Sequence, residues 1–417
     1  MTSPVQVGVI GAGYWGRKLV YEYLSAECKG TVKLAGVCDS SSSALLFCRE
    51  EFSVRDELLT EKAEDLIGDS KISAVHIATP NHTHYALARM ALEAGKDVLV
   101  EKPMTLSSRE AYELVDLAAS QGLVLQVGHI FRFNSALCKA REILDEGVLG
   151  KIFYVRVQWT DSRYYPDRDI IFDLGPHPVD VLNQLLKAWP IQVSGFARAY
   201  RNSRNHEEIA YGLAEFGDGV FAHIELSWLH PGKTREVTIV GSEATLVVDC
   251  LSQRVALHAP SGVTEVPIPA NNTIEEEIGW FADCARKRCL DIESGLIGAR
   301  TVEVLEAMHK SMWERPLPIV QPVEHDHTAV IISILESIGE DVDQTAFTKH
   351  GLVDRTEFEK YLETMLKLGL VRTSATKDAR YEVTQDGLRF LREYGDIQRD
   401  LGKSTLESHE KALSNSV

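Results

Sequence analysis

Apolar runs and helical patterns alternate along the first 128 residues of the chain. Five segments are almost continuously apolar, as expected of parallel strands buried on both faces: VQVGVIGAG, VKLAGVCD, AVHIAT, DVLVEK and LVLQVGH. Between two of them, HTHYALARMALEAG repeats apolar residues at helical spacing and ends at Gly95. This alternation predicts βαβ units that form a doubly wound α/β domain over residues 1–128.

Residues 129–320 show a different pattern. GKIFYVRVQWTDS alternates apolar with polar positions, and LAEFGDGVFAHIELSW predicts a hairpin that turns on Gly217, Asp218 and Gly219. REVTIVGSEATLVVDC and RVALHA extend the meander, and helical patterns flank it at PVDVLNQLLKA and GLIGARTVEVLEAMHKSM. We therefore expect an α+β domain built around a large, mostly antiparallel open sheet.

The remaining residues change pattern again. WERPLPIVQPVEHDH contains three prolines and no periodicity, so residues 321–325 are predicted to be a linker. Residues 326–400 combine helical stripes with a strand, a basic turn, a second strand and a final helix, an order that resembles the winged-helix domains of prokaryotic regulators. Residues 401–417 are predicted to form a polar tail.

Composition narrows the class of protein. No apolar run approaches the roughly 18 residues of a membrane span, and the first strand begins too early to leave room for a signal peptide. The seven cysteines are dispersed and form no C-x-x-C pair, which suggests reduced thiols in a cytoplasm. The formal net charge of −17 opposes broad attraction to nucleic acid or anionic lipid. We therefore expect a cytoplasmic protein without a membrane partner.

A glycine-rich turn follows the first predicted strand. GVIGAGYWG places Gly11, Gly13 and Gly16 at G-x-G-x-x-G spacing between a strand and a helix. The first glycine permits a tight turn, the second lets the backbone approach a pyrophosphate, and the third lets the helix pack closely on the sheet. Asp39 lies 23 residues beyond Gly16, where a carboxylate binds the ribose hydroxyls and repels a 2′-phosphate. The spacing predicts a dinucleotide site that prefers NAD to NADP.

Four motifs in this order resemble the Gfo/Idh/MocA oxidoreductases, a family named after glucose–fructose oxidoreductase and inositol dehydrogenase: GAGYWG, ATPNHTH, EKP and DLGPHPVD. The resemblance implies a Rossmann domain, followed by an α/β substrate domain whose open sheet forms a homo-oligomer interface. It also implies which residues border the NAD cofactor: Gly11, Gly13, Tyr14, Trp15, Gly16, Asp39, Thr79, Pro80, Asn81, His84, Glu101 and Lys102. For His84, a helix-capping or surface role is an equal alternative.

The same resemblance assigns the chemistry to three side chains. Lys102 of EKP would project toward the nicotinamide and the reacting hydroxyl, where a cation stabilises a developing alkoxide. Asp173 and His177 are four residues apart at the mouth of a helix and would face the same pocket, with His177 as the acid/base and Asp173 in its polar network. A helix N-terminus lowers the pKa of a nearby histidine, which would keep His177 neutral. Asp180 completes the motif or serves as a structural acid.

Further segments suggest the substrate class. GYWGRKLV, VGHIFRFNSAL, WTDSRYYPDRDIIFDLGPHPVD and SWLHPGKTREVTIVG resemble the branch that oxidises nucleotide-linked sugars, such as the UDP-N-acetylglucosamine 3-dehydrogenases. Guanidinium forks pair bidentately with diphosphates and carboxylates. A nucleotide sugar or its uronic acid would therefore meet a set of candidate substrate residues: Arg132, Asn134, Arg163, Tyr164 and Arg168. The alternatives are ordinary surface arginines at a sheet edge, and inositol or a free sugar as the substrate.

Two further points bear on function. His325 and His327 lack cysteine or carboxylate company at ligand spacing, so no metal site is predicted. The alternative to a dehydrogenase is a transcriptional regulator that senses NAD or a sugar and binds DNA through the winged helix. Residues 325–417 hold 12 Lys and Arg against 17 Asp and Glu, and this net charge of −5 favours dimerisation or docking over DNA binding.

Overall fold

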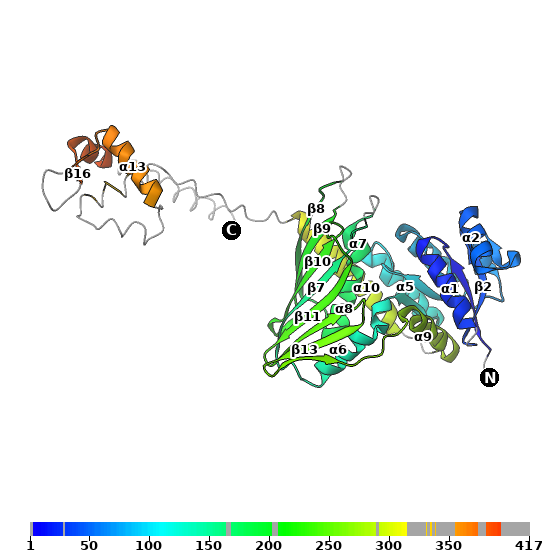
Figure 1. The fold of residues 1–417 in the computed structure, drawn as a ribbon. Helices are drawn as coiled ribbons and strands as arrows, with labels where there is room; N and C mark the ends of the chain where they lie inside the picture. The colour runs from blue at the N-terminus through cyan, green and yellow to red at the C-terminus, as the bar shows by residue number, and fades with distance from the viewer. Residues whose placement is uncertain are drawn as a thin grey trace. The chain divides into compact units, whose positions relative to one another are not determined.

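The computed structural model describes residues 3–27, 30–163, 168–201, 207–288, 292–314, 355–373 and 381–392, together with residues 331, 334, 335 and 338. The chain divides into two compact units, Met1–Pro316 and Leu317–Val417, whose elements are drawn in Figure 1. The predicted linker and polar tail lie outside the described residues, so the boundaries proposed for them stay predictions.

The first layer of the larger unit is a six-stranded parallel sheet with the order β3-β2-β1-β4-β5-β6. The five apolar runs form all of these strands except β3, and the doubly wound α/β prediction is confirmed. The order reverses between β1 and β4, so a ligand crevice is expected at the carboxyl ends of these two strands. The strands are β1 (Val5–Ile10), β2 (Val32–Cys38), β3 (Leu59–Thr60), β4 (Ala74–Ile77), β5 (Asp97–Glu101) and β6 (Leu125–Gly128).

Helices pack on this parallel-sheet layer. The predicted helix that ends near Gly95 is α4, and Gly95 itself has a φ of 75°, which favours glycine at this position. The helices between the strands are α1 (Tyr14–Glu27), α2 (Ser42–Phe52), α3 (Ala63–Gly68), α4 (His84–Glu93) and α5 (Ser108–Gln121), with short 3₁₀ turns η1 (Asp56–Leu58) and η2 (Asn81–Thr83).

One helix from far along the chain returns to the same layer. α9 (Thr273–Lys287) lies beside α1 (Figure 1), and its buried apolar residues join the cluster that contains β1 and α1. The side chain of Asn272 starts this helix by accepting hydrogen bonds from two backbone N–H groups of its first turn. The first half of α10 (Ile292–Glu314) also packs here, against α5 and β6, through Ala299 and Val302.

The second layer is an eight-stranded sheet with the order β14-β13-β12-β11-β7-β10-β9-β8. Among its described strands, β7 and β10 are parallel, and the other neighbouring pairs are antiparallel. The predicted β9–β10 hairpin and the meander from β11 are confirmed. The strands are β7 (Ile152–Thr160), β8 (Gln192–Arg198), β9 (Ile209–Glu215), β10 (Phe221–Ser227), β11 (Thr234–Gly241), β12 (Thr245–Asp249), β13 (Arg254–Ala259) and β14 (Gly262–Val266).

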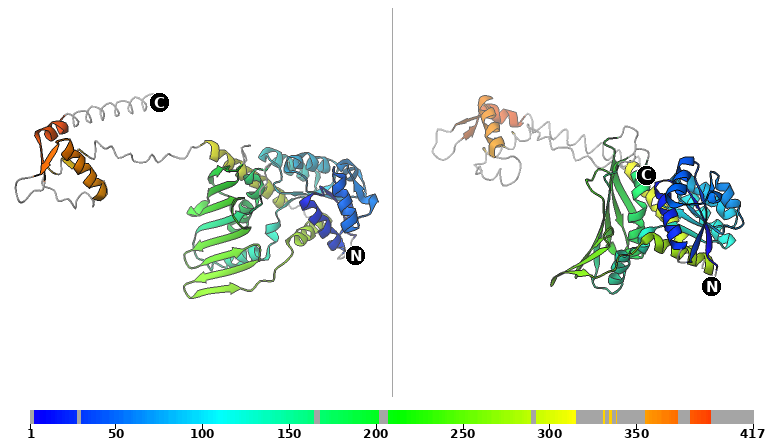
Figure 2. Two further views of the ribbon diagram at one scale, coloured as in Figure 1. Left: turned by 45° about the horizontal axis from the view of Figure 1, so that its top comes forward. Right: turned by 45° about the vertical axis from the view of Figure 1, so that its right-hand side comes forward.

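One face of this sheet is covered and the other is open. On β7, Val155, Val157 and Trp159 are buried, whereas Tyr154 and Arg156 on the opposite face are exposed. Helices α6 (Ser135–Asp145), α8 (Pro176–Leu186) and α10 lie along the covered face (Figure 2). The 3₁₀ turn η3 (Ile130–Phe133) leads into α6, and the turn η4 (Gly217–Gly219) joins β9 to β10.

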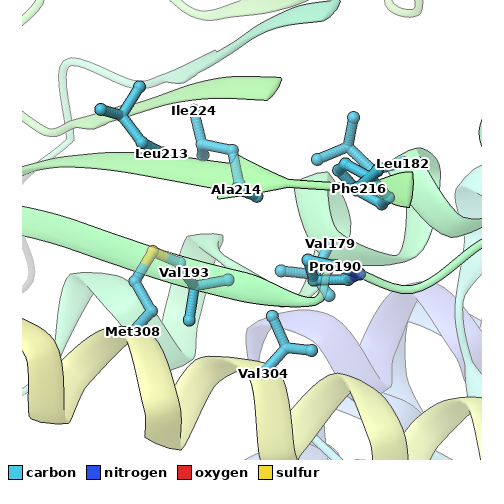
Figure 3. Close-up of a pocket in the computed structure, with 10 residues that line it drawn as sticks. All are labelled: Val179, Leu182, Pro190, Val193, Leu213, Ala214, Phe216, Ile224, Val304 and Met308. Carbon is cyan, nitrogen blue, oxygen red and sulfur yellow. The ribbon is translucent and has the colours of Figure 1, made fainter. Parts of the chain in front are cut away.

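A small apolar pocket lies where β8, β9 and β10 meet α8 and α10 (Figure 3). No titratable side chain lines it, and it contains none of the predicted site residues. It is a gap in the packing of the core rather than a place for polar chemistry. Its lining consists of Val179, Leu182, Pro190, Val193, Leu213, Ala214, Phe216, Ile224, Val304 and Met308.

The smaller unit contains the two strands and the final helix predicted for a winged helix, whereas the basic turn predicted between the strands lies outside the described residues. β15 (Val371–Thr373) pairs with β16 (Tyr381–Val383) in antiparallel fashion, and residues 385–392 are helical. Together with α13 (Arg355–Lys367), they surround a small apolar core made of Ile334, Leu335, Leu362, Met365, Leu370 and Val371.

Candidate active site

The glycine turn after β1 has the geometry that a pyrophosphate requires. Gly11 has a φ of 101°, and a Cβ there would lie 2.5 Å from the carbonyl oxygen of Ala78. A Cβ on Gly16 would lie 1.9 Å from the carbonyl oxygen of Gly11, so only glycine allows α1 to approach β1 this closely. A Cβ on Gly13 would have nothing within 4 Å, which leaves open space at the N-terminus of α1. A dinucleotide pyrophosphate fits this turn.

Asp39 follows β2 and is bonded to the glycine turn. Its Oδ2 accepts a hydrogen bond from the Ala12 N–H at 2.7 Å, and its Oδ1 accepts one from the Ser41 N–H at 2.8 Å. The carboxylate is therefore held at the carboxyl end of β2, partly exposed and beside the glycine turn. A fixed negative charge at this place suits ribose hydroxyls and opposes a 2′-phosphate.

His84 joins two loops that border the crevice. Its ring is fully buried at the start of α4, with the two nitrogens 2.9 Å from the carbonyl oxygen of Thr79 and 2.8 Å from that of Pro103. Burial lowers the pKa of His84. Pro80 is exposed and Asn81 is partly buried in the same turn. His84 is thus not a surface residue, and its contacts fix the shape of the Thr79 and Pro103 loops.

Glu101 is turned inward at the end of β5. Its Oε1 accepts a hydrogen bond from the indole N–H of Trp15 and lies 3.4 Å from Nε2 of His76. The Nδ1 of His76 is 3.1 Å from the hydroxyl of Tyr23. Burial opposes the ionisation of Glu101, but the contacts with His76 and Trp15 and the charge of Lys102 hold its pKa below the usual value. The carboxylate therefore anchors Trp15, which lies next to the glycine turn.

Lys102 and Asp173 come together from different layers. Lys102 follows β5, whereas Asp173 lies in α7 (Ile170–Leu174) of the second layer. The ammonium of Lys102 donates a hydrogen bond to the carbonyl oxygen of Asp173 at 2.7 Å and lies 4.0 Å from its Oδ1. Arg168 donates to the same Oδ1 at 2.9 Å. The side chain of Lys102 is 18% exposed, so its charge is held at the edge of the crevice.

His177 lies beside this pair, near the start of α8. Its ring centroid is 5.0 Å from that of Phe131 and 6.0 Å from that of Trp159. Burial lowers the pKa of His177 well below its usual value, and the charges of Lys102 and Arg235 lower it further. The direction agrees with the prediction from sequence, and burial and neighbouring cations contribute to it. The imidazole is therefore neutral at pH 7 and able to accept a proton.

Two of the predicted substrate residues are held by contacts within the chain. Arg132 donates a hydrogen bond to Oδ1 of Asp180 at 2.6 Å and another to Oδ1 of Asn183 at 2.7 Å. Asn134 is 1% exposed, and its side chain accepts hydrogen bonds from two backbone N–H groups in the first turn of α6. Asp180 thus serves as a structural acid, which is one of the two roles that the sequence left open. Tyr164 lies outside the described residues.

A row of charged side chains continues from the site, and no sequence motif predicted it. Arg235 is buried in β11, with Nη2 3.9 Å from Oδ2 of Asp161. Asp161 accepts a hydrogen bond from Arg163 at 3.1 Å, and Arg163 donates one to the hydroxyl of Tyr14 at 3.2 Å. One signal was available in the sequence: Arg235 occupies an inward-facing position of the predicted strand. A charged side chain is buried only when it has partners, so this position indicated a polar site.

Two features are absent from the described ranges. They contain no helix that is both long and apolar enough to cross a membrane. In those same ranges, no three His, Cys, Asp or Glu side chains are grouped so that they could hold a metal ion.

Three family models match the chain. Residues 5–129 match "Oxidoreductase family, NAD-binding Rossmann fold", residues 137–247 match "GFO/IDH/MocA C-terminal domain", and residues 325–401 match "Winged helix-turn-helix". The winged-helix resemblance of the C-terminal residues is thereby confirmed.

Characterised dehydrogenases are among the similar proteins. The UDP-N-acetylglucosamine 3-dehydrogenase of Acidithiobacillus ferrooxidans is 30% identical over 64% of this chain and 80% of its own length. The scyllo-inositol 2-dehydrogenase (NAD(+)) of Bacillus subtilis is 28% identical over 66% of this chain and 85% of its own length. The D-xylose 1-dehydrogenase (NADP(+)) of Haloarcula marismortui is 24% identical over 72% of this chain and 90% of its own length.

A solved structure of the Acidithiobacillus enzyme has the same fold. It matches with a TM-score of 0.65 at 24% identity, covering 75% of this chain and 100% of its own chain.

Proposed function

Because the chain belongs to the Gfo/Idh/MocA oxidoreductase family, we propose that it transfers a hydride between a hydroxyl group of a nucleotide sugar and NAD. It is an NAD(P)-dependent dehydrogenase that acts on CH–OH groups, like the characterised relatives. The observation that carries the proposed hydride transfer is the contact between Lys102 and Asp173 from two layers, near an imidazole, that of His177, whose pKa is lowered.

Each of the three side chains has a separate task. Nicotinamide, when bound, accepts the hydride from the carbon or returns it. Lys102 places a positive charge beside the reacting oxygen and stabilises the negative charge that develops there. His177 accepts the hydroxyl proton on a ring nitrogen, so that the carbon–oxygen bond becomes a carbonyl. Asp173 positions Lys102 through its backbone carbonyl, and its carboxylate lies between Lys102 and Arg168.

Asp39 supports NAD as the cofactor. Both of its oxygens already accept backbone N–H bonds, so the carboxylate cannot swing away from the ribose side of the turn. A 2′-phosphate placed there would meet a fixed negative charge. The names of the relatives include an NAD-dependent and an NADP-dependent enzyme. The preference of this chain for NAD over NADP therefore has to be measured.

The test follows nicotinamide absorbance. The full chain is incubated with NAD or NADP and, separately, with UDP-N-acetylglucosamine, its uronic acid, UDP-glucose, myo-inositol and free hexoses. We expect reduction of NAD by one nucleotide sugar, and a loss of about 10²- to 10³-fold in kcat in the Lys102→Ala variant. NADH binding should survive in the variant, because the glycine turn and Asp39 are unchanged.

Two results would count against this proposal. Equal turnover in Lys102→Ala would remove the lysine from the chemistry. Reduction of NAD by inositol or free hexoses alone would keep the dehydrogenase and reject the nucleotide sugar.

A further inference from the structure

A row of cations extends from the candidate active site along one side of the crevice. It begins next to His177, where Arg235 Cζ lies 5.3 Å from the ring centroid of Trp159. From Arg235 it passes through Asp161 to Arg163 by the contacts given above. These contacts join the end of β7 and the start of β11, which are neighbouring strands.

Tyr14 connects this row to the first layer. Its hydroxyl accepts a hydrogen bond from Arg163 at 3.2 Å, and its ring centroid lies 4.7 Å from Nζ of Lys18. The same ammonium is 5.3 Å from the ring of Trp15. The hydrogen bonds and charges of Arg163 and Lys18 lower the pKa of Tyr14. Two cations from different layers therefore meet at one exposed aromatic ring.

Lys233 adds another cation at the same place. It precedes β11, and its loop is held to the end of β7 because the hydroxyl of Thr160 donates to the carbonyl oxygen of Gly232 at 3.3 Å. Among the described residues, Lys233 forms no ion pair within 4 Å and no side-chain hydrogen bond. Partial burial lowers its pKa, and the charges of Arg235, Arg163 and Lys18 lower it further against the opposing effect of Asp161.

The side chains around Lys233 carry an excess of positive charge, whereas the chain as a whole is negatively charged. The four cations face two described acids, Asp161 and Asp173, in a chain whose formal net charge is −17. Like charges that are held together repel one another, and the repulsion is relieved when an anion binds between them. The chain therefore maintains an arrangement that favours an anionic ligand within reach of His177.

We propose that Lys18, Arg163 and Lys233 form a subsite for an anionic group of the substrate, a phosphate or carboxylate attached to the sugar. This inference rests on the proposed function and extends it, because it assigns recognition of the anion to particular side chains. The subsite adjoins the glycine turn, because Lys18 lies against Tyr14 and Trp15, which stand between Gly13 and Gly16. Lys18 and Lys233 reach it from opposite layers, so the bound anion would bridge them.

The binding test uses the full chain saturated with NADH, so that the cofactor phosphates occupy the glycine turn before a probe is added. Inorganic pyrophosphate and UDP are titrated calorimetrically into the wild type and into Lys18→Gln, Lys233→Gln and Lys233→Arg. We expect both probes to bind the wild type, each Gln variant to lose about tenfold in affinity, and Lys233→Arg to retain it. Lys151→Gln is the matched control, because this exposed lysine lies at the opposite end of β7.

Equal affinity in the wild type and both Gln variants would overturn the proposal, as would no binding of either probe to the NADH-loaded wild type. A second arm compares turnover of UDP-N-acetylglucosamine, glucose 1-phosphate, glucuronate and glucose, which separates diphosphate, phosphate, carboxylate and neutral substrates. The KM of the preferred anionic substrate should rise about tenfold in Lys233→Gln, with a smaller change in kcat.

The two proposals can fail independently. Oxidation of neutral sugars alone, at unchanged rates in the lysine variants, would overturn the anion subsite and leave the dehydrogenase in place. Lysine-dependent binding of pyrophosphate without oxidation of any sugar would support the subsite and reject the proposed reaction.

Discussion

The protonation of His177 depends on side chains from several elements around it. Phe131 and Trp159 exclude water from one side of the ring, and Lys102 and Arg235 supply positive charge. Each of these effects disfavours an imidazolium. A base that stays neutral is what proton removal from a hydroxyl requires, so the environment of the residue sets its chemical state.

Replacing Lys102 by Met is expected to raise the pKa of His177. The ammonium that opposes the imidazolium is removed, whereas burial of the ring persists, so the rise should be about one pH unit or more. The measurement is an NMR titration of ¹³C-labelled histidines, in which the His177 signal is identified by its loss in His177→Asn. In the wild type this signal should titrate below pH 6.5.

The control for this titration is Lys139→Met. Lys139 is a partly exposed partner of Glu142 on α6, so its removal should leave the His177 signal unchanged. A His177 pKa that is the same in Lys102→Met and in the wild type would contradict the proposed electrostatic coupling.

At the scale of elements, α9 places an acidic side chain inside the first layer, although this helix comes from late in the chain. Glu277 of α9 is fully buried, and neither of its carboxylate oxygens has a hydrogen-bond partner among the described residues. Burial raises the pKa of Glu277 well above its usual value, and the charges of Glu101 and Asp180 raise it further. The folded protein therefore retains the Glu277 proton to a higher pH than the unfolded chain does.

This proton makes stability depend on pH in a defined direction. The folded state keeps the proton, whereas the unfolded chain releases it above its ordinary carboxyl pKa of 4.5. The free energy of unfolding should therefore fall as pH rises from about 4.5 toward the raised pKa, by about 1.4 kcal/mol per pH unit for this group. Glu277→Gln stays neutral in both states, so its stability relative to the wild type should increase with pH over the same window.

Urea unfolding of both proteins at pH 4, 6 and 8 measures this difference. The control is Glu276→Gln, because Glu276 is exposed on the same helix and should show no such trend. A Glu277→Gln difference that is constant from pH 4 to pH 8 would mean that Glu277 is ionised in the folded protein.

The elements also show what the sequence could and could not predict. Local signals sufficed for most of the strands, though not for β3, β8 and β14, and for the glycine turn and the Asp173–His177 spacing, because each depends on residues close together in the chain. The cap at Asn134 also forms with its immediate neighbours, but an asparagine before an apolar stretch suits a cap and a ligand contact equally. The packing of α9 depends on contacts between residues distant in sequence. Lys233 becomes part of the proposed subsite only because β7 and β11 pair, so no local sequence pattern could identify it.

At the scale of the whole molecule, charge separates the roles of the two units. The smaller unit matches a winged helix, yet Arg372 of its wing is paired with Glu382 at 2.9 Å, and residues 325–417 carry a net charge of −5. A DNA-binding surface needs an excess of positive charge, because phosphate contacts supply most of the affinity. The excess of cations lies instead beside the proposed catalytic site, which favours a small anionic substrate over a nucleic acid.

The open face of the eight-stranded sheet leads to the last prediction. Four large side chains on three adjacent strands are exposed there on one face: Tyr154, Tyr211, Leu213 and Phe221. We call these four side chains the apolar patch, and large exposed apolar side chains gathered on one face are typical of an interface. The resemblance to the family also implied a homo-oligomer through this sheet. We therefore expect the purified full chain to form a dimer or tetramer in solution.

Light scattering after size-exclusion chromatography gives the mass, and the double variant Leu213→Lys with Phe221→Lys should shift it toward that of one chain of 46.4 kDa. Each chain would then bring two added positive charges to the contact, which opposes association. Tyr21→Lys is the control, since this exposed aromatic residue lies on α1 in the other layer. If the double variant keeps the wild-type mass, the copies associate through another surface. A wild-type mass of one chain would instead leave the open face without a second copy, and the apolar patch would need a different partner.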